Sequence, residues 1–190
     1  MRIFYFQPTF PLLGRGLKPT RLGCWPNIPL RSSGTRRANI RFGTMKMLHD
    51  PLYRAELEKR LAALRPDSPR KWGKMSVDQM LWHVNTTLQL HLGEITAATE
   101  RTRLPRRVIK FLVLNLPWPR GAPTLATLVA KQQYDFADEH KRCLQLIDKF
   151  TSKKLDEEWP ENPIFGKVSG TDLSRLQAKH LDHHLRQSGV

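Results

Sequence analysis

Residues 173–190, "LSRLQAKHLDHHLRQSGV", close the chain with three histidines inside five positions. Leucines recur at helical intervals through this stretch, which predicts an amphipathic helix. At about 100° per residue, the rings of His180 and His184 fall about 40° apart and inside the leucine-lined sector. His183 falls on the margin of that sector. The stretch therefore predicts a helix that turns two imidazoles toward a core.

The preceding sequence shows the same periodicity in other segments. An N-cap at Asp50 followed by Pro51 predicts a helix that ends before Pro66, and Ser76 with Gln79 forms a capping box for a helix over 77–97. We expect further helices over 105–115, over 125–150, and from Ser169 or Thr171 to Gly189. No useful strand-like alternation and no repeat appear. The expected fold is all-α: an antiparallel four-helix bundle with one short extra helix.

The first 44 residues differ in composition from the rest. They hold eight Arg or Lys, no acidic residue, and five each of the prolines and glycines. Such a segment cannot bury enough apolar surface to order itself, so residues 1–44 are interpreted as a disordered basic extension or as a mis-assigned start. We favour a true start at Met45 or Met47. Residues 45–190 then form the helical domain.

The formal net charge of +15 is concentrated in that first segment, because the remaining 24 Arg and Lys face 17 Asp and Glu and leave +7. Cys24 and Cys143 lie far apart, so no disulfide framework is implied and a reducing, cytoplasmic setting is expected. No apolar run reaches the roughly 20 residues of a transmembrane helix. Glycine-rich phosphate loops and DNA-reading motifs are absent, so no specific nucleic-acid partner is expected.

A third imidazole, His83, lies in the first turns of the helix predicted over 77–97. Two histidines four residues apart on a helix can hold a transition metal together, and a third neutral nitrogen would leave one coordination position open. The alternative is that these are core histidines satisfied by hydrogen bonds. A zincin site is excluded, because that chemistry needs Glu directly after the first His of the pair, where Leu181 stands.

Two stretches carry a family resemblance: "KWGKMSVDQMLWHVNTTLQ" and "RLQAKHLDHHLRQSG". Together they resemble the DinB-like superfamily of metal-binding four-helix bundles, in particular a bacterial branch of it, over about residues 48–190. The resemblance implies a divalent metal, zinc, nickel or iron, held by His83, His180 and His184. The chain departs from the family pattern after His184, and Asn162 stands where relatives have a His before a Pro-x-Phe-Gly turn.

Some members of the superfamily resemble thiol transferases, which join a low-molecular-weight thiol such as bacillithiol or mycothiol to an electrophile. The resemblance therefore implies a thiol and an electrophile as partners, while enzymatic activity itself stays open. The alternative is a non-enzymatic module whose basic surface holds nucleic acid or acidic lipid. The basic, apolar stretch over 101–118 would carry this alternative, or would act as a lid. The favoured interpretation of this stretch is a basic amphipathic helix that packs on the bundle. The oligomeric state stays open, and a homodimer is compatible with the sequence.

The remaining histidines and the tryptophans receive simpler interpretations. His49, His91 and His140 stand alone in the sequence and are expected on the surface. Four tryptophans are expected to pack in the core or along a cleft: Trp72, Trp82, Trp118 and Trp159. Trp82, next to His83, is also a candidate wall of the metal pocket.

Overall fold

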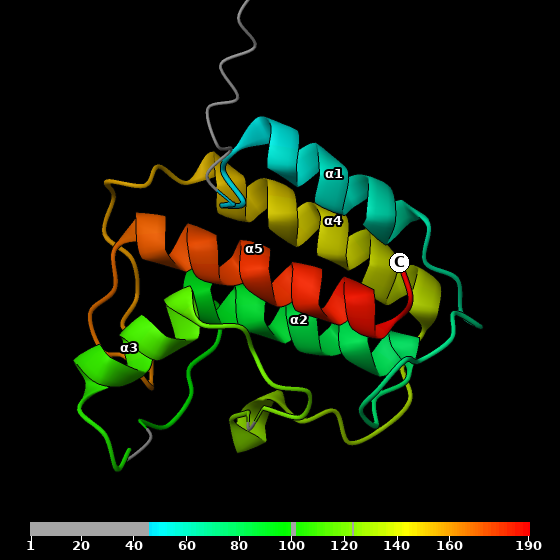
Figure 1. Ribbon diagram of the computed structural model, residues 1–190. Coiled ribbons are helices and arrows are strands. Elements are labelled where there is room, and N and C mark those ends of the chain that lie inside the picture. Colours follow the sequence, from blue (N-terminus) through cyan, green and yellow to red (C-terminus); the bar gives the residue numbers. More distant parts are fainter. Residues whose placement is uncertain (1–45, 100–101, 123) are drawn as a thin grey trace, which may run out of the picture. The chain divides into compact units, whose positions relative to one another are not determined.

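The computed structural model describes residues 46–99, 102–122 and 124–190, and over these ranges the chain is helical without a β-strand (Figure 1). The helices are α1 (Pro51–Ala62), α2 (Val77–Leu92), α3 (Arg106–Asn115), the short 3-10 helix η1 (Ala126–Leu128), α4 (Phe136–Ser152) and α5 (Gly170–Gln187). The expected all-α class is confirmed. Both interpretations of residues 1–44 concern residues outside the described ranges.

Four helices, α1, α2, α4 and α5, form the bundle, and α3 lies outside it against α5 (Figure 1). Just before α1, the backbone N–H of Leu48 donates to the carbonyl oxygen of Ser174 over 3.1 Å. Near the far end of α1, the Arg60 guanidinium lies 2.6 Å from the Asp182 carboxylate. α1 and α5 therefore run parallel.

α2 and α4 also run parallel, and a long connection joins them in the chain. The backbone N–H of Tyr134, just before α4, donates to the Asp78 carboxylate over 2.8 Å at the start of α2. At the opposite ends, the Lys149 ammonium lies 2.5 Å from the Glu94 carboxylate. The connection over residues 93–135 holds α3 and η1 and brings the chain back to the same end of the bundle. The expected four-helix bundle is thus confirmed, with this one crossover.

Leucine side chains from all four bundle helices fill the core. Each fully buried Leu stabilises the fold by about 1.5–3 kcal/mol relative to leaving it exposed. The side chains that are at most 2 % exposed include Leu57, Leu61, Leu81, Leu88, Ile147, Phe150, Leu173, Leu181 and Leu185. The leucines of α2 and α5 belong to this one core, so the two helices that carry the histidines pack against each other.

Two expected helix boundaries are wrong. α2 ends at Leu92 rather than near residue 97, because Gly93 adopts a left-handed conformation with φ of 79° that caps the helix. α4 begins at Phe136 rather than Leu125, because the side chain of Asp135 accepts a hydrogen bond from the backbone N–H of Asp138 and starts the helix there. Part of the segment that was expected to begin this helix instead forms η1, which packs against α2.

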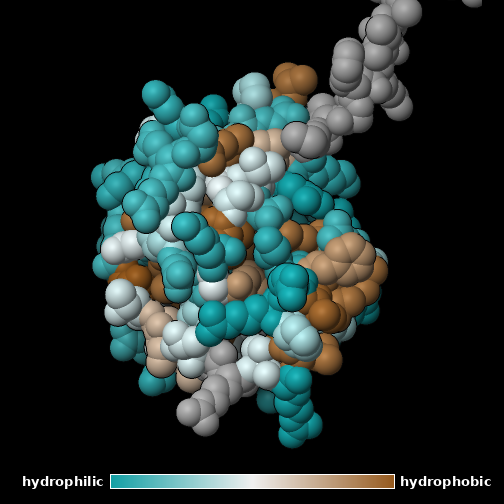
Figure 2. Space-filling model, turned by 90° about the vertical axis from the view of Figure 1, so that its left-hand side faces the viewer, coloured by the Kyte–Doolittle hydropathy of each residue, from teal (hydrophilic) through white to brown (hydrophobic). Residues whose placement is uncertain are grey.

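The short extra helix expected over 105–115 is present as α3, and it leaves much of its apolar surface in solvent. None of its residues is buried. Figure 2 faces the side of the molecule where α3 lies and shows hydrophobic surface gathered in one area beside hydrophilic surface. The large hydrophobic side chains exposed in and next to α3 are Leu104, Val108, Phe111, Leu112 and Leu116. α3 therefore packs on the bundle by one side only.

Candidate metal centre

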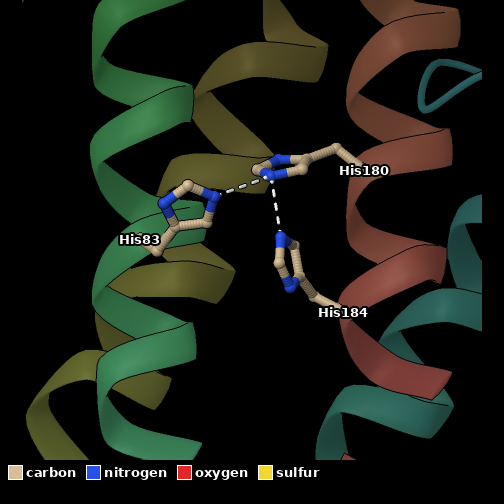
Figure 3. Close-up of side chains that lie close together, drawn as sticks. All are labelled: His83, His180 and His184. Atoms are coloured by element: carbon tan, nitrogen blue, oxygen red, sulfur yellow. Dashed lines mark hydrogen bonds between the residues drawn. The ribbon is translucent and has the colours of Figure 1, made fainter. Parts of the chain in front are cut away.

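Two facing helices bring the three predicted histidines together in the core. His83 comes from the second turn of α2, and His180 and His184 come from successive turns of α5 (Figure 3). The three residues are buried, with exposures of 4 %, 6 % and 7 %. Helical spacing explains the pair on α5, and the antiparallel packing of α2 against α5 supplies the third ring.

The Nε2 atoms of the three rings point at one another. The Nε2 atom of His180 lies 3.0 Å from that of His83 and 3.0 Å from that of His184 (Figure 3). One ligand nitrogen from each ring can be chosen so that all three lie within 4.8 Å of one another. Metal–nitrogen distances of about 2.0–2.1 Å place neighbouring donors roughly 3.0–3.4 Å apart around one ion. The two 3.0 Å separations therefore match the spacing of donors around one ion.

Hydrogen bonds on the far side fix the tautomers of two rings. The Nδ1 atom of His83 lies 2.7 Å from the carbonyl oxygen of Leu128, and Nδ1 of His184 lies 2.8 Å from Oε1 of Gln187. Gln187 is held in this orientation because its Nε2 donates to the carbonyl oxygen of Trp72 over 3.0 Å. Since both oxygens only accept, each Nδ1 carries the hydrogen and each Nε2 presents a lone pair to the centre.

The third ring cannot satisfy both of those lone pairs. His180 has one ring hydrogen when neutral, and its Nδ1 is buried without a hydrogen-bond partner among the described residues. If its Nε2 donates to His83, the lone pair of His184 stays unpaired, and a buried unpaired polar atom costs about 1–3 kcal/mol. A cation at the centre would accept all three lone pairs. The donor set therefore fits a metal ion better than a hydrogen-bonded core.

Burial keeps the three rings in the form that binds metals. It lowers the pKa of His83 and of His180, and it lowers the pKa of His184 to about 3. For His180, the neighbouring rings of His184 and His83 lower the pKa further. All three imidazoles are therefore neutral at neutral pH, with lone pairs free for coordination.

The expectation that His91 lies on the surface is wrong. His91 is 3 % exposed, and both of its ring nitrogens contact amide groups, those of Gln177 and Asn162. Its ring is not among those of the cluster. Nor are His49 and His140 free surface side chains, since both are partly buried and bonded to groups of other segments.

Asn162, at the position where the family resemblance expects a His, orders the turn that follows it. Its side-chain oxygen accepts from the backbone N–H groups of Ile164 and Phe165 at 2.9 and 3.0 Å, and a backbone bridge joins it to Gly166. Its amide nitrogen lies 2.9 Å from Nε2 of His91. The turn therefore supports α2 through His91 and provides no ligand to the histidine cluster.

Trp118 lies next to the cluster, and Trp72 lies next to His183. Trp82 stacks on Tyr134, with ring centroids 5.0 Å apart. The ring of Trp118 lies 5.7 Å from that of His180 and 5.6 Å from that of His183. Trp72 lies 5.8 Å from His183 on another side. The half-buried His183 thus sits between two indoles rather than in the cluster.

Sequence reasoning missed the groups that orient the cluster. Gln187 lies three residues after His184, which is helical contact spacing, so its position carried a usable signal. No sequence pattern points to the carbonyl group of Leu128, because its role depends on η1 folding back against α2. A cluster oriented by such outer contacts binds a metal more tightly than the same three rings left free to rotate.

The fold and the cluster define a class: a four-helix bundle with three buried imidazoles facing one another across two helices. A family model described as the DinB superfamily matches residues 54–188, and the chain belongs to this superfamily. The match covers α1 from Arg54 onward, the other three bundle helices and the three histidines. No curated protein and no solved structure matches the chain. None of the helices in the described ranges combines the length and hydropathy that a bilayer crossing requires.

Proposed function

We propose that the chain binds a divalent metal ion through Nε2 of His83, His180 and His184, and that it uses the ion to activate a low-molecular-weight thiol for transfer to an electrophile. The observation that carries the proposal is the set of converging lone pairs, two of which are fixed by hydrogen bonds on the far side of their rings. Membership of the DinB superfamily adds support for a metal.

The chain's own residues contribute orientation and charge. Leu128 and Gln187 hold two rings in place, and burial keeps all three neutral. A divalent ion held by neutral ligands keeps its positive charge and favours a thiolate over a thiol. Zinc, nickel and iron all suit imidazole ligands. In the transfer, the thiolate sulfur forms a bond to the electrophilic atom, the leaving group departs with its electron pair, and the thiol proton goes to solvent.

Within the described part of the chain, no cysteine is placed to supply the thiol. Cys143 is the cysteine in the described part of the chain, and it is fully buried. Burial raises its pKa to about 12, so its side chain stays a protonated thiol at neutral pH. It also lies on α4, whereas the cluster is on α2 and α5.

An assay with metal-loaded full-length protein tests this proposal. Bacillithiol, mycothiol and glutathione are each mixed with an aryl halide, and loss of free thiol is followed with and without protein. We expect at least one thiol to be consumed faster with the zinc-, nickel- or iron-loaded wild type, and the acceleration to disappear in His184→Ala. If the metal binds and no thiol reacts faster, the transferase part of the proposal is wrong.

The exposed face of α3 favours a second candidate function, binding to an acidic lipid surface. Phe111 is 61 % exposed and Val108 42 %, and the basic side chains of Arg103 and Arg107 are exposed beside them. Apolar side chains flanked by arginines are the pattern of a helix that lies on an anionic bilayer. Lys110, by contrast, is engaged with Asp172 of α5 at 3.2 Å.

Vesicle flotation separates this candidate from the first. The full-length protein should float with vesicles that contain phosphatidylserine and stay behind with phosphatidylcholine alone. Phe111→Ser should weaken flotation, whereas Leu52→Ser, which changes an even more exposed apolar side chain on α1, should leave it unchanged. Equal flotation of both variants and the wild type would assign the binding to general charge and would show that α3 is not the binding surface.

A further inference from the structure

A pocket of about 400 Å³ opens beside the histidine cluster, a size that suits a small-molecule ligand. Segments from three parts of the chain form it: the loop before α2, the loop after α3, and α5. Its walls include the indoles of Trp72 and Trp118, the cations of Arg120, Lys179 and Arg186, and the carboxylate of Asp182. The pocket therefore combines flat apolar surfaces with basic groups.

One layer of rings separates this pocket from the cluster. His183 lines the pocket, and its ring centroid lies 5.2 Å from that of His184. Trp118 also lines the pocket and lies 5.7 Å from the ring of His180. A molecule in the pocket would thus lie on the far side of residues that touch two of the three candidate ligands.

The charge that faces the pocket is positive. Its one acidic group, Asp182, is already engaged by Arg60 at 2.6 Å and by Arg186 at 2.8 Å. Arg120 forms no ion pair within the described ranges, and its guanidinium lies 5.0 Å from the ring centroid of Trp72. An unpaired guanidinium held against an indole is a ready partner for an anionic group.

Lys179 adds a second cation that is held in place. Its ammonium group donates to the carbonyl oxygens of Val113 and Leu116, and it lies 5.5 Å from the ring centroid of Trp118. These contacts attach the end of α3 to α5 and keep Trp118 in the pocket wall. An ammonium group has three N–H donors, so one stays available for a ligand.

Two buried side-chain nitrogens belong to residues beside the pocket. The indole Nε1 of Trp72 and the Nδ1 of His180 are buried without a hydrogen-bond partner among the described residues. Polar atoms in this state are uncommon in native structures and often mark places where a ligand or water completes the site. Both belong to residues that contact His183 or Trp118, which line the pocket.

We infer that this pocket binds a small organic anion with a planar apolar body, such as an aromatic carboxylate or phosphate. The anionic group lies against Arg120 and Lys179, and the planar body lies against Trp118 and Trp72. That this anion is the electrophilic substrate of the thiol transfer rests on the proposed function. The binding itself does not, because the pocket is formed without the three cluster histidines.

Calorimetric titration of the full-length protein tests the inference with matched probes. The probes are 2-naphthoate, 2-naphthyl phosphate and the neutral amide 2-naphthamide, each added to metal-loaded and chelator-treated protein. One of the two anions should bind at least about tenfold more tightly than the amide, as a charge-assisted hydrogen bond to a guanidinium implies. The anion that binds identifies the head group.

Two variants locate the binding. Arg120→Gln should weaken the anion about tenfold and leave the amide unchanged, while Arg142→Gln, an exposed arginine on α4 outside the pocket, should change neither. Trp118→Leu should weaken anion and amide alike. The same samples are assayed for bound metal, so that loss of metal and loss of anion are seen separately.

The outcomes distinguish this inference from the proposed function. If anion and amide bind equally, or if neither anion binds, the pocket is not an anion site even where the metal is retained. If Arg142→Gln weakens the anion as much as Arg120→Gln, the binding lies elsewhere. If the anion binds and no metal does, the inference stands and the metal proposal falls.

Discussion

The same two helices hold two buried histidine sites that differ in their hydrogen bonding. At one site, between α2 and α5, both ring nitrogens of His91 contact side-chain amides. At the other, two lone pairs face His180, whose single hydrogen cannot satisfy both. Burial lowers the pKa of the rings at both sites. Burial alone is therefore no sign of a metal, whereas unpaired lone pairs that converge are.

The largest expected effect is stabilisation by metal at one site only. With an ion at about a thousandfold above its dissociation constant, binding to the folded state adds about 4 kcal/mol to the free energy of unfolding. We expect this increase in the wild type and in His91→Gln, and none in His180→Ala. Urea unfolding followed by circular dichroism, with either metal or chelator present, measures it.

The absolute stability of His91→Gln is expected to fall, because its amide partners lose their ring contacts. The comparison therefore rests on the difference between metal and chelator for each protein. A metal-dependent increase in His180→Ala as large as in the wild type would place the ion outside the cluster.

The next largest effect is the loss of stability that His91 causes in acid. Burial lowers the pKa of His91 to about 4 from an ordinary value of 6.5. Below pH 6.5, His91 binds a proton in the unfolded chain but not in the folded chain. The free energy of unfolding therefore falls as the pH falls, and it levels off near pH 4. Above pH 6.5 His91 has no such effect. The total loss is about 3 kcal/mol.

Subtracting two pH series isolates this contribution. Unfolding of chelator-treated wild type and His91→Gln is measured at several pH values, and the wild type should lose about 3 kcal/mol more between pH 6.5 and pH 4. The cluster histidines titrate in both proteins and cancel. Identical pH profiles would show that His91 is not held neutral by the fold.

A smaller effect is expected from the residue that orients His184. Gln187→Ala removes the acceptor at 2.8 Å from Nδ1, which frees the ring to rotate and to change tautomer. Loss of such a contact typically weakens metal binding 10–100-fold, or about 1.4–2.7 kcal/mol. Competition with a coloured chelator measures the affinity.

The matched control is Gln177→Ala, which removes the amide next to His91. It should lower stability and leave metal affinity within about twofold of the wild type. If the two glutamine variants lose affinity equally, the outer hydrogen bond of His184 has no specific role.

The sequence was informative about the cluster because the cluster rests on local spacing. The pair on α5 follows from four-residue separation, and a bundle fold brings an inward-facing ring on α2 within reach of it. The caps at Asp50 and Ser169 followed in the same way from short-range patterns and are confirmed. These features depend on residues that lie within one or two helical turns.

The features that sequence reasoning missed depend on where loops fold. Leu128 reaches His83 because the segment before α4 forms the separate 3-10 helix η1, and the turn at Asn162 contacts the buried His91 from a distant part of the chain. The anion pocket unites Trp72, Trp118 and α5, which lie far apart in the chain. Neither periodicity nor composition encodes these long-range contacts.

The central claim is that the cluster, and not His91, holds a metal ion. Full-length wild type, His180→Ala and His91→Gln are purified alike, exposed to equal amounts of zinc, nickel or iron, desalted, and assayed for metal per chain by mass spectrometry. We expect about one equivalent in the wild type and in His91→Gln, and close to none in His180→Ala. A wild type without metal, or a His180→Ala variant that keeps a full equivalent, would contradict the claim.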